Sequence, residues 1–164
     1  MRLVIADTGP VNYLILIGHI DLLPRMFERV VLPAAVQTEL ASSLAPPAVQ
    51  RWIADFPAWL EIAQTPAVTL LTGIHKGEAA AIALAVAMHA DLLLIDGRRG
   101  IRAAKQQGLR VTGTLGLLDL AAGRGLVDFA DAIRKPEGTS FRRPEMLLQA
   151  LLNKYKRPDK SSPR

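Results

Sequence analysis

The fold is decided by residues 91–97, which read Asp91-Leu92-Leu93-Leu94-Ile95-Asp96-Gly97. Four consecutive apolar residues are typical of a central strand in a parallel sheet, because such a strand is buried on both faces. A second short apolar run, residues 2–6, also leads into an aspartate, Asp7. We therefore expect two strands of one sheet, each followed directly by an acidic residue.

The rest of the chain alternates short apolar runs with longer helical patterns, separated by Gly and Pro. This alternation predicts an α/β domain with a mainly parallel sheet. Further strands are expected at residues 29–32, 59–63 and 109–112. Helices are expected from Pro10 to a stop at Gly18, and at residues 21–27, 34–44, 48–56, 76–90, 98–107, 115–122, 128–134 and 145–155.

A length of 164 residues suits one domain with an appendage. We expect residues 1–127 to form the main body, residues 128–157 a helical extension packed on it, and residues 158–164 a basic tail. Half of the residues are hydrophobic, which is enough to build a core, but only 5% are aromatic. The scarcity of aromatic side chains argues against an RNA binder that works by stacking bases.

The chain contains no cysteine, which excludes disulfides, thiolate metal sites and a cysteine nucleophile. Only four apolar residues precede Asp7, and the longest apolar run, residues 79–88, has ten residues. Both are too short for a signal sequence or a membrane span. We expect a soluble, cytoplasmic protein whose metal, if it has one, is held by oxygen or imidazole.

The net charge of +5 is concentrated near the C-terminus. Residues 1–133 carry 11 Lys and Arg against 12 Asp and Glu, whereas residues 134–164 carry nine against three. Such a basic end either contacts phosphate backbones or is a solvated terminus, and the sequence leaves both readings open.

Four acidic residues lie next to apolar stretches, where solvated carboxylates are not expected. Asp7 and Asp96 follow predicted strands, at the edge of a parallel sheet where ligands bind. Glu78 lies in line with apolar residues of a helix that has almost no polar face, and Glu39 flanks a second apolar stripe. At about 5 Å, each pair of carboxylates would repel by roughly 3 kcal/mol at an effective dielectric near 20, which favours a bound cation. Such an all-oxygen site suits Mg²⁺ or Mn²⁺, and the chemistry that needs it is phosphodiester hydrolysis.

Each acid also has a simpler interpretation when taken singly. Asp7 could cap a helix, Asp96 with Gly97 could form a turn, Glu78 could favour a helix dipole, and Glu39 could be a surface charge. His19, His75 and His89 lie in unrelated segments, and His89 is interpreted as a core or capping residue. Residues 113–116, Gly113-Thr114-Leu115-Gly116, lack the spacing of a dinucleotide-binding loop. Taken by itself, Thr114 is interpreted as a helix N-cap, while the family resemblance described next leaves a role at the site open for it.

In their order along the chain, five segments resemble the successive motifs of PIN-domain ribonucleases. They are most similar to the VapC-toxin-like branch, which carries Gly-Glu at the third acidic position and then a Gly-Thr-Leu-Gly segment. The resemblance runs from residue 2 to about residue 127, and the helical extension is also similar. The segments are Val4 to Pro10, Leu32-Pro33 with Val36 to Glu39, Lys76 to Glu78 with Ala81 to Ala85, Leu93 to Asp96 with Ala103-Ala104, and Gly113 to Gly116.

The resemblance implies a three-layer, flavodoxin-like fold and Mg²⁺- or Mn²⁺-dependent endoribonuclease activity. It assigns Asp7, Glu39, Glu78 and Asp96 to the metal-binding and catalytic cluster. It further implies a toxin controlled by a cognate antitoxin whose segment covers the active site, with a homodimer left open. Just past Asp96 stand three arginines, expected to contact the RNA backbone: Arg98, Arg99 and Arg102.

The chain departs from many relatives at Gly97, which stands where they carry a second acid. This departure bears on the binding of a second metal, while one-metal catalysis remains compatible with the other acids. It also favours an alternative, a catalytically impaired module of the same fold that binds RNA or a partner protein. A phosphatase acting on small phosphoesters ranks last, because Gly9 stands where its usual Asp-x-Asp motif needs an acid.

Overall fold

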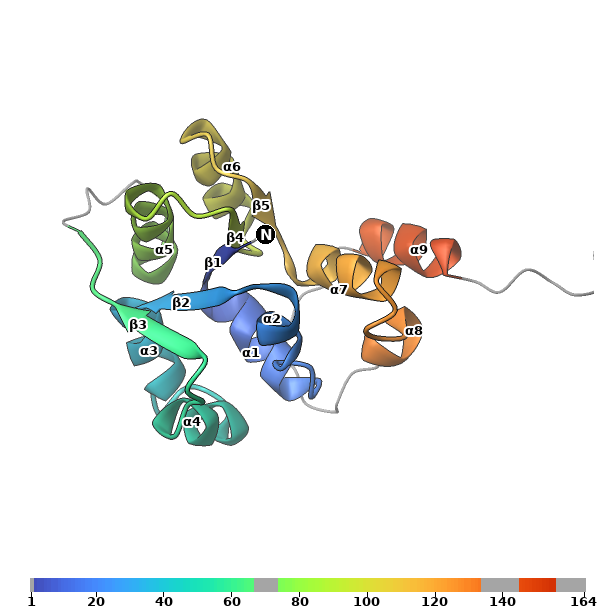
Figure 1. The fold of residues 1–164 in the computed structure, drawn as a ribbon, viewed down its shortest axis with the longest axis horizontal. Helices are drawn as coiled ribbons and strands as arrows, with labels where there is room; N and C mark the ends of the chain where they lie inside the picture. The colour runs from blue at the N-terminus through green and yellow to red at the C-terminus, as the bar shows by residue number, and fades with distance from the viewer. Residues whose placement is uncertain (1, 67–73, 134–144, 156–164) are drawn as a thin grey trace, which may run out of the picture.

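The computed structural model describes residues 2–66, 74–133 and 145–155, which fold around a five-stranded sheet (Figure 1). The strand order is β3-β2-β1-β4-β5, and every pairing between neighbours is parallel. The predicted α/β class with its parallel sheet is confirmed. The strands are β1 (Leu3–Ala6), β2 (Arg29–Pro33), β3 (Leu60–Ala63), β4 (Leu92–Leu94) and β5 (Val111–Thr112).

Helices cover both faces of the sheet, which gives the expected three layers (Figure 1). One face packs against α5 (Lys76–Ala87) and α6 (Arg98–Gln106). The other face carries the larger core, to which the remaining helices contribute. These are α1 (Thr8–Leu16), α2 (Leu22–Met26), α3 (Ala34–Ala41), α4 (Pro47–Ala54), α7 (Thr114–Gly123), α8 (Phe129–Ala132) and α9 (Glu145–Lys154).

The two central strands are buried on both faces, as their apolar sequences predict. Val4 of β1 and Leu94 of β4 point into the larger core, whereas Ile5 and Leu93 point into the core beneath α5 and α6. All four side chains are fully buried. Because side chains alternate along a strand, one continuous apolar run supplies both layers.

Helix α1 begins two residues earlier than predicted. Thr8 is its first residue, and Pro10 is tolerated in the first turn because its missing N–H would have no helical partner there. The predicted stop at Gly18 is confirmed by its positive φ of 76° and by the bond from the His19 N–H to the Leu14 carbonyl, at 2.8 Å.

Two helices end three residues before their predicted ends. Helix α3 stops at Ala41, because Ser42 is extended. Helix α5 stops at Ala87, because His89 adopts a left-handed φ of 52° and the Ala90 N–H then bonds the Ala85 carbonyl at 3.0 Å. His89 is exposed, so the capping interpretation holds and the core interpretation is wrong.

Strand β5 is also shorter than the predicted residues 109–112. The N–H of Leu109 bonds the Ala104 carbonyl at 3.1 Å, so Leu109 closes α6 instead of joining the sheet. Only Val111 and Thr112 pair with β4.

Helix α9 packs against α7 and α8. Leu151, Leu152 and Tyr155 contact the larger core, and the Tyr155 ring stacks on Phe129 of α8 at 5.1 Å between ring centroids. The division into a body and an extension stays a prediction, and the predicted tail at residues 158–164 lies outside the described residues. Among the helices of the described ranges, none has the length and apolar character that crossing a bilayer requires.

Candidate functional site

The carboxyl ends of β1 and β4 meet at the middle of the sheet. The two strands pair in the register Ala6 to Leu94, and the Asp7 N–H extends this ladder to the Leu94 carbonyl at 2.9 Å. After β1 the chain builds β2 and β3 on one side, and then crosses to build β4 on the other side. Such a reversal of strand order opens a crevice between the two strand ends. Asp7 and Asp96 stand at that crevice.

Two helices bring further acids to the same place. Helix α3 follows β2 without a loop and carries Glu39, and α5 carries Glu78 in its first turn. The two helices pack against each other. All four predicted acids thereby line one cavity of about 380 Å³, which we name the acidic pocket. Its lining residues are Asp7, Thr8, Gly9, Glu39, His75, Glu78, Asp96 and Gly97.

Asp7 is the most buried of the four acids. Only 6% of its surface is exposed, and its Oδ1 atom is buried without a hydrogen-bond partner. It occupies the N-cap position of α1, yet its side chain makes no capping bond, so the capping interpretation fails. Burial raises the pKa of Asp7 to about 7, against the opposing effect of the Thr8 backbone N–H. The other three acids of the pocket raise it further by charge repulsion.

Asp96 is held by a single residue, Thr114, which is fully buried. The Thr114 N–H donates to Asp96 Oδ1, and the Thr114 hydroxyl donates to Oδ2, both at 2.7 Å. Burial raises the pKa of Asp96, and the two bonds from Thr114 lower it. The interpretation of Thr114 as an N-cap is wrong, because Gly113 takes that position and Thr114 is the first residue of α7.

Glu39 is oriented by α1 and by the start of α5. The Thr8 hydroxyl donates a hydrogen bond to Glu39 Oε2. The same carboxylate lies so close to the Gly77 backbone that a Cβ there would overlap it. Glu39 is therefore fixed at the pocket wall by a neighbour on each side.

Glu78 reaches across to the first turn of α6. A Cβ on Gly97 would lie 2.8 Å from Glu78 Oε1, and a Cβ on Gly100 would lie 2.6 Å from Oε2. Gly97 therefore leaves the space that the Glu78 carboxylate uses, and a second acid at this position would displace it. Burial raises the pKa of Glu78, the charge of His75 lowers it, and that of Glu39 raises it.

The donor set of the pocket fits a divalent cation such as Mg²⁺ or Mn²⁺. Four carboxylates supply oxygen ligands, and the unpartnered Oδ1 of Asp7 lacks the neighbour that a cation would provide. Across the described ranges, however, no three acidic or imidazole groups are arranged as a ready-made metal site. The carboxylates of the pocket repel one another, and those of Glu39 and Asp96 bond to Thr8 and Thr114.

The predicted arginines follow the pocket along α6. Arg98, Arg99 and Arg102 are all exposed and pair with no acid among the described residues. Arg98 and Arg102 line a groove of about 550 Å³ together with Lys105, while Arg99 lies outside it. We name this surface the α6 groove; its residues are Arg98, Ile101, Arg102, Lys105 and Gln106.

Sequence reasoning missed three residues of the site. Thr8 and Thr114 hold Glu39 and Asp96, and His75 lines the pocket. Thr8 directly follows Asp7, and this position could have indicated that Thr8 lies at the site. Only the family resemblance of Gly113 to Gly116 points to Thr114, because its hydrogen-bond partner stands 18 residues earlier in the chain.

Comparisons with known proteins agree with this architecture. A family model described as the PIN domain matches residues 3–157. Among solved structures, the fold is similar to a PilT N-terminus domain protein from the hyperthermophilic archaeon Sulfolobus solfataricus P2. The TM-score is 0.52 at 12% sequence identity, over 84% of this chain and 99% of that one. No curated protein matches the sequence.

The family model covers nearly the whole described chain, including the strands that end at Asp7 and Asp96 and the helices that carry Glu39 and Glu78. The resemblance carried by the sequence motifs is thus confirmed at the level of the family. The chain belongs to the PIN-domain family.

Proposed function

We propose that the protein is a metal-dependent endoribonuclease that hydrolyses RNA phosphodiester bonds in the acidic pocket. The PIN domain is a nuclease-type fold, and this chain retains an acid at each of four pocket positions. The observation that carries the proposal is the cavity itself: four carboxylates line it, and the most buried of them has an oxygen without a partner.

In this mechanism Asp7, Glu78 and Asp96 would hold Mg²⁺ or Mn²⁺, and Glu39 would complete the site, either as a further ligand or through a group that contacts the ion. The bound ion supplies activation of water and stabilisation of the leaving oxygen. Thr114 keeps both Asp96 oxygens oriented, and Thr8 keeps Glu39 oriented. Arg98, Arg99 and Arg102 bind the backbone of the RNA, because exposed arginines without acidic partners are free to pair with phosphate.

The motifs Gly77-Glu78 and Gly113 to Gly116 support a more specific role, the toxin of a toxin–antitoxin pair in the cytoplasm. A small antitoxin protein would then cover the acidic pocket. Co-purification with the product of an adjacent small reading frame, and loss of cleavage in that complex, is the expected result.

The test is cleavage of fluorescent RNA by the full chain with Mg²⁺, with Mn²⁺ and with chelator. We expect cleavage that depends on the metal and falls at least about 100-fold in Asp7→Asn. The matched control is Asp21→Asn, which changes an exposed aspartate beside α2 and should cleave like the wild type. Equal cleavage by a folded Asp7→Asn variant, or undiminished cleavage in chelator, would contradict the proposal.

The alternative is an impaired PIN domain that binds RNA or a partner protein without cutting. The specific observation in its favour is that no three pocket acids in the described chain are already arranged around one ion. RNA binding of equal strength by wild type and Asp7→Asn, with no cleavage by either under any metal, would support this alternative.

A further inference from the structure

A second groove, of about 600 Å³, lies beside the acidic pocket on the side of β3. It is bounded by α3, by the start of α5 and by the residues that follow β3. We name it the α3–α5 groove. Its lining residues include Ala35, Thr38, Thr65, Lys76, Ala79 and Ala80.

The groove is open because its facing helices carry small side chains. Ala35 on α3 and Ala79 and Ala80 on α5 stand where larger residues would fill the space. Thr65 and Lys76 also line the groove, as does Thr38, whose hydroxyl donates to the Ala34 carbonyl at 3.1 Å. A surface of this kind can accommodate an RNA strand, in which charged phosphates alternate with less polar bases and sugars.

Lys76 is the positively charged residue among those that line this groove. It is exposed and pairs with no acid among the described residues, although Glu78 is only two positions away. The two residues serve different cavities, since Lys76 lines this groove whereas Glu78 lines the acidic pocket. A positive charge at the first position of a 12-residue helix is disfavoured by the helix dipole, so local helix stability does not explain Lys76.

A hydroxyl group without a partner lies in the same groove. The Oγ1 atom of Thr65 is buried and makes no hydrogen bond. Thr65 and Lys76 line the same groove, and a hydroxyl and an ammonium both supply donors that phosphate oxygens accept.

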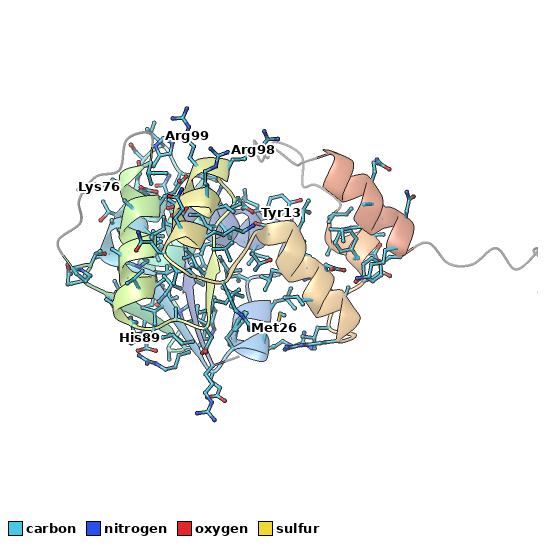
Figure 2. All side chains as sticks on the ribbon, turned by 90° about the horizontal axis from the view of Figure 1, so that it is seen from above. Tyr13, Met26, Lys76, His89, Arg98 and Arg99 are labelled. Atoms are coloured by element: carbon cyan, nitrogen blue, oxygen red, sulfur yellow. The ribbon has the colours of Figure 1, made fainter. Side chains whose placement is uncertain are left out.

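The two grooves lie on opposite sides of the acidic pocket. Helix α5 contacts α3 on one side and α6 on the other, and the pocket lies at its first turn. Figure 2 shows Lys76, Arg98 and Arg99 at the same end of the molecule, far from His89 at the other end of α5. A strand laid across this end would meet one basic groove before the pocket and the other after it.

We propose that Lys76, with Thr65, binds a backbone phosphate of the RNA on the side of the cleaved bond opposite to the α6 groove. This inference rests on the proposed function, and it adds the path of the substrate. The strand enters along one groove, crosses the acidic pocket and leaves along the other. Nucleotides on both sides of the cut are then held, which favours cleavage within a strand over removal of a terminal nucleotide.

The first experiment measures binding of a labelled single-stranded RNA to the full chain in chelator, where no cleavage is expected, over a series of salt concentrations. Lys76→Ala should weaken binding several-fold and reduce the slope of log K against log salt by about 0.7, the value for one phosphate contact on a single strand. Arg110→Ala is the matched control, because Arg110 is exposed at the amino end of β5, away from the site. It should bind like the wild type.

A second variant blocks the groove without removing a cation. Ala35→Glu places a carboxylate in it at the second position of α3, where the helix dipole favours a negative charge, so the chain should fold. It should weaken RNA binding at least as much as Lys76→Ala. Once the cut position is mapped, substrates shortened from one end should lose their sensitivity to Lys76→Ala but keep their sensitivity to Arg98→Ala with Arg102→Ala.

The outcomes separate this inference from the proposed function. Suppose that Lys76→Ala and Ala35→Glu bind RNA with the affinity and salt slope of Arg110→Ala, while the double variant Arg98→Ala with Arg102→Ala loses RNA binding. That result would overturn the role of the α3–α5 groove and leave the proposed nuclease function standing. A wild-type chain that neither binds nor cuts RNA would overturn both.

Discussion

An aspartate in the acidic pocket and an aspartate at the contact between α7 and α9 have opposite surroundings and opposite pKa shifts. Asp119 on α7 accepts hydrogen bonds from Lys154 Nζ at 2.8 Å and from the Tyr155 hydroxyl at 2.5 Å. Both bonds lower the pKa of Asp119. Asp7 is far more buried, forms no ion pair with any residue that the structure describes, and has its pKa raised to about 7.

The difference shows which carboxylates the fold uses for its own stability. Asp119 contacts Lys154 of α9 at 2.8 Å, and Glu61 pairs with Arg29 at 2.8 Å, so each of these two acids has a cationic partner. The acids of the pocket instead face one another, which lowers the stability of the metal-free protein. The proposed metal ion would account for a cluster that opposes folding, and four predictions test that contrast.

The largest expected effect concerns Asp7 and pH. Its pKa is raised from 3.8 to about 7 on folding, so its contribution to stability is present below pH 4 and is lost as pH rises through 7. At about 1.4 kcal/mol per pKa unit, the metal-free chain should lose at most about 4 kcal/mol of unfolding free energy over that range. Denaturant unfolding in chelator between pH 4 and pH 8 measures this loss.

The matched variant for this prediction is Asp7→Asn, which cannot ionise. Its stability should vary less with pH and should exceed that of the wild type at pH 8. The slope that remains comes from Asp96 and Glu78, whose pKa values are also raised. The clustered-acid model would be contradicted if the unfolding free energy of the wild type increased from pH 4 to pH 8 and that of Asp7→Asn increased by the same amount.

The second effect is stabilisation by metal. An ion that binds only the folded chain adds about 2.7 kcal/mol at 100 times its dissociation constant. Mg²⁺ or Mn²⁺ should therefore raise the midpoint of thermal unfolding, and chelator should reverse the rise. Glu78→Gln should lose most of this shift, whereas Asp21→Asn should keep it. An equal shift in both variants would place the ion outside the pocket.

The third effect concerns the residue that orients Asp96. Thr114→Val removes the hydroxyl but keeps the shape and the backbone N–H, so one charge-assisted bond is lost at a cost of about 2 kcal/mol. The pKa of Asp96 should rise, because that bond lowers it. Titration of the Asp96 carboxyl by nuclear magnetic resonance measures the change. Thr114→Ser keeps the hydroxyl and should restore the wild-type titration; a Val variant that titrates like the Ser variant would argue against this role.

The smallest effect is expected at the paired aspartate. Tyr155→Phe removes the hydroxyl that bonds Asp119 but keeps the aromatic ring that stacks on Phe129. Thermal unfolding should change little, because the contact is partly exposed and Lys154 still pairs with Asp119. RNA cleavage should be unchanged. A large loss of cleavage would mean that α9 takes part in the site and would weaken the contrast between the two regions.

Much of the fold could be predicted from local patterns. The apolar run before Asp96 predicted a doubly buried strand, and Gly18 ended α1 through its positive φ. The errors lie at element ends, where a hydrogen bond decides between continuing and stopping. Leu109 is apolar enough for a strand, yet its N–H bonds back to α6.

The site was predictable only in part for a related reason. Asp7 and Asp96 follow strands, and their position is visible in the sequence. The position of Thr114 relative to Asp96 is not visible there, because their bond forms only when α7 packs beside the end of β4. Gly97 looked like a missing acid, and its close approach to Glu78 became apparent only in three dimensions.

The sequence by itself determined the strands, the acids that follow them and the family motifs, because these depend on the order and polarity of neighbouring residues. The tertiary structure decided which acids share a cavity, which oxygen of Asp7 lacks a partner, and that Lys76 and Glu78 line different cavities. Those properties depend on the reversal of strand order and on helix packing. Burial and charge repulsion act between groups that the chain separates by as many as 89 residues and the fold brings together.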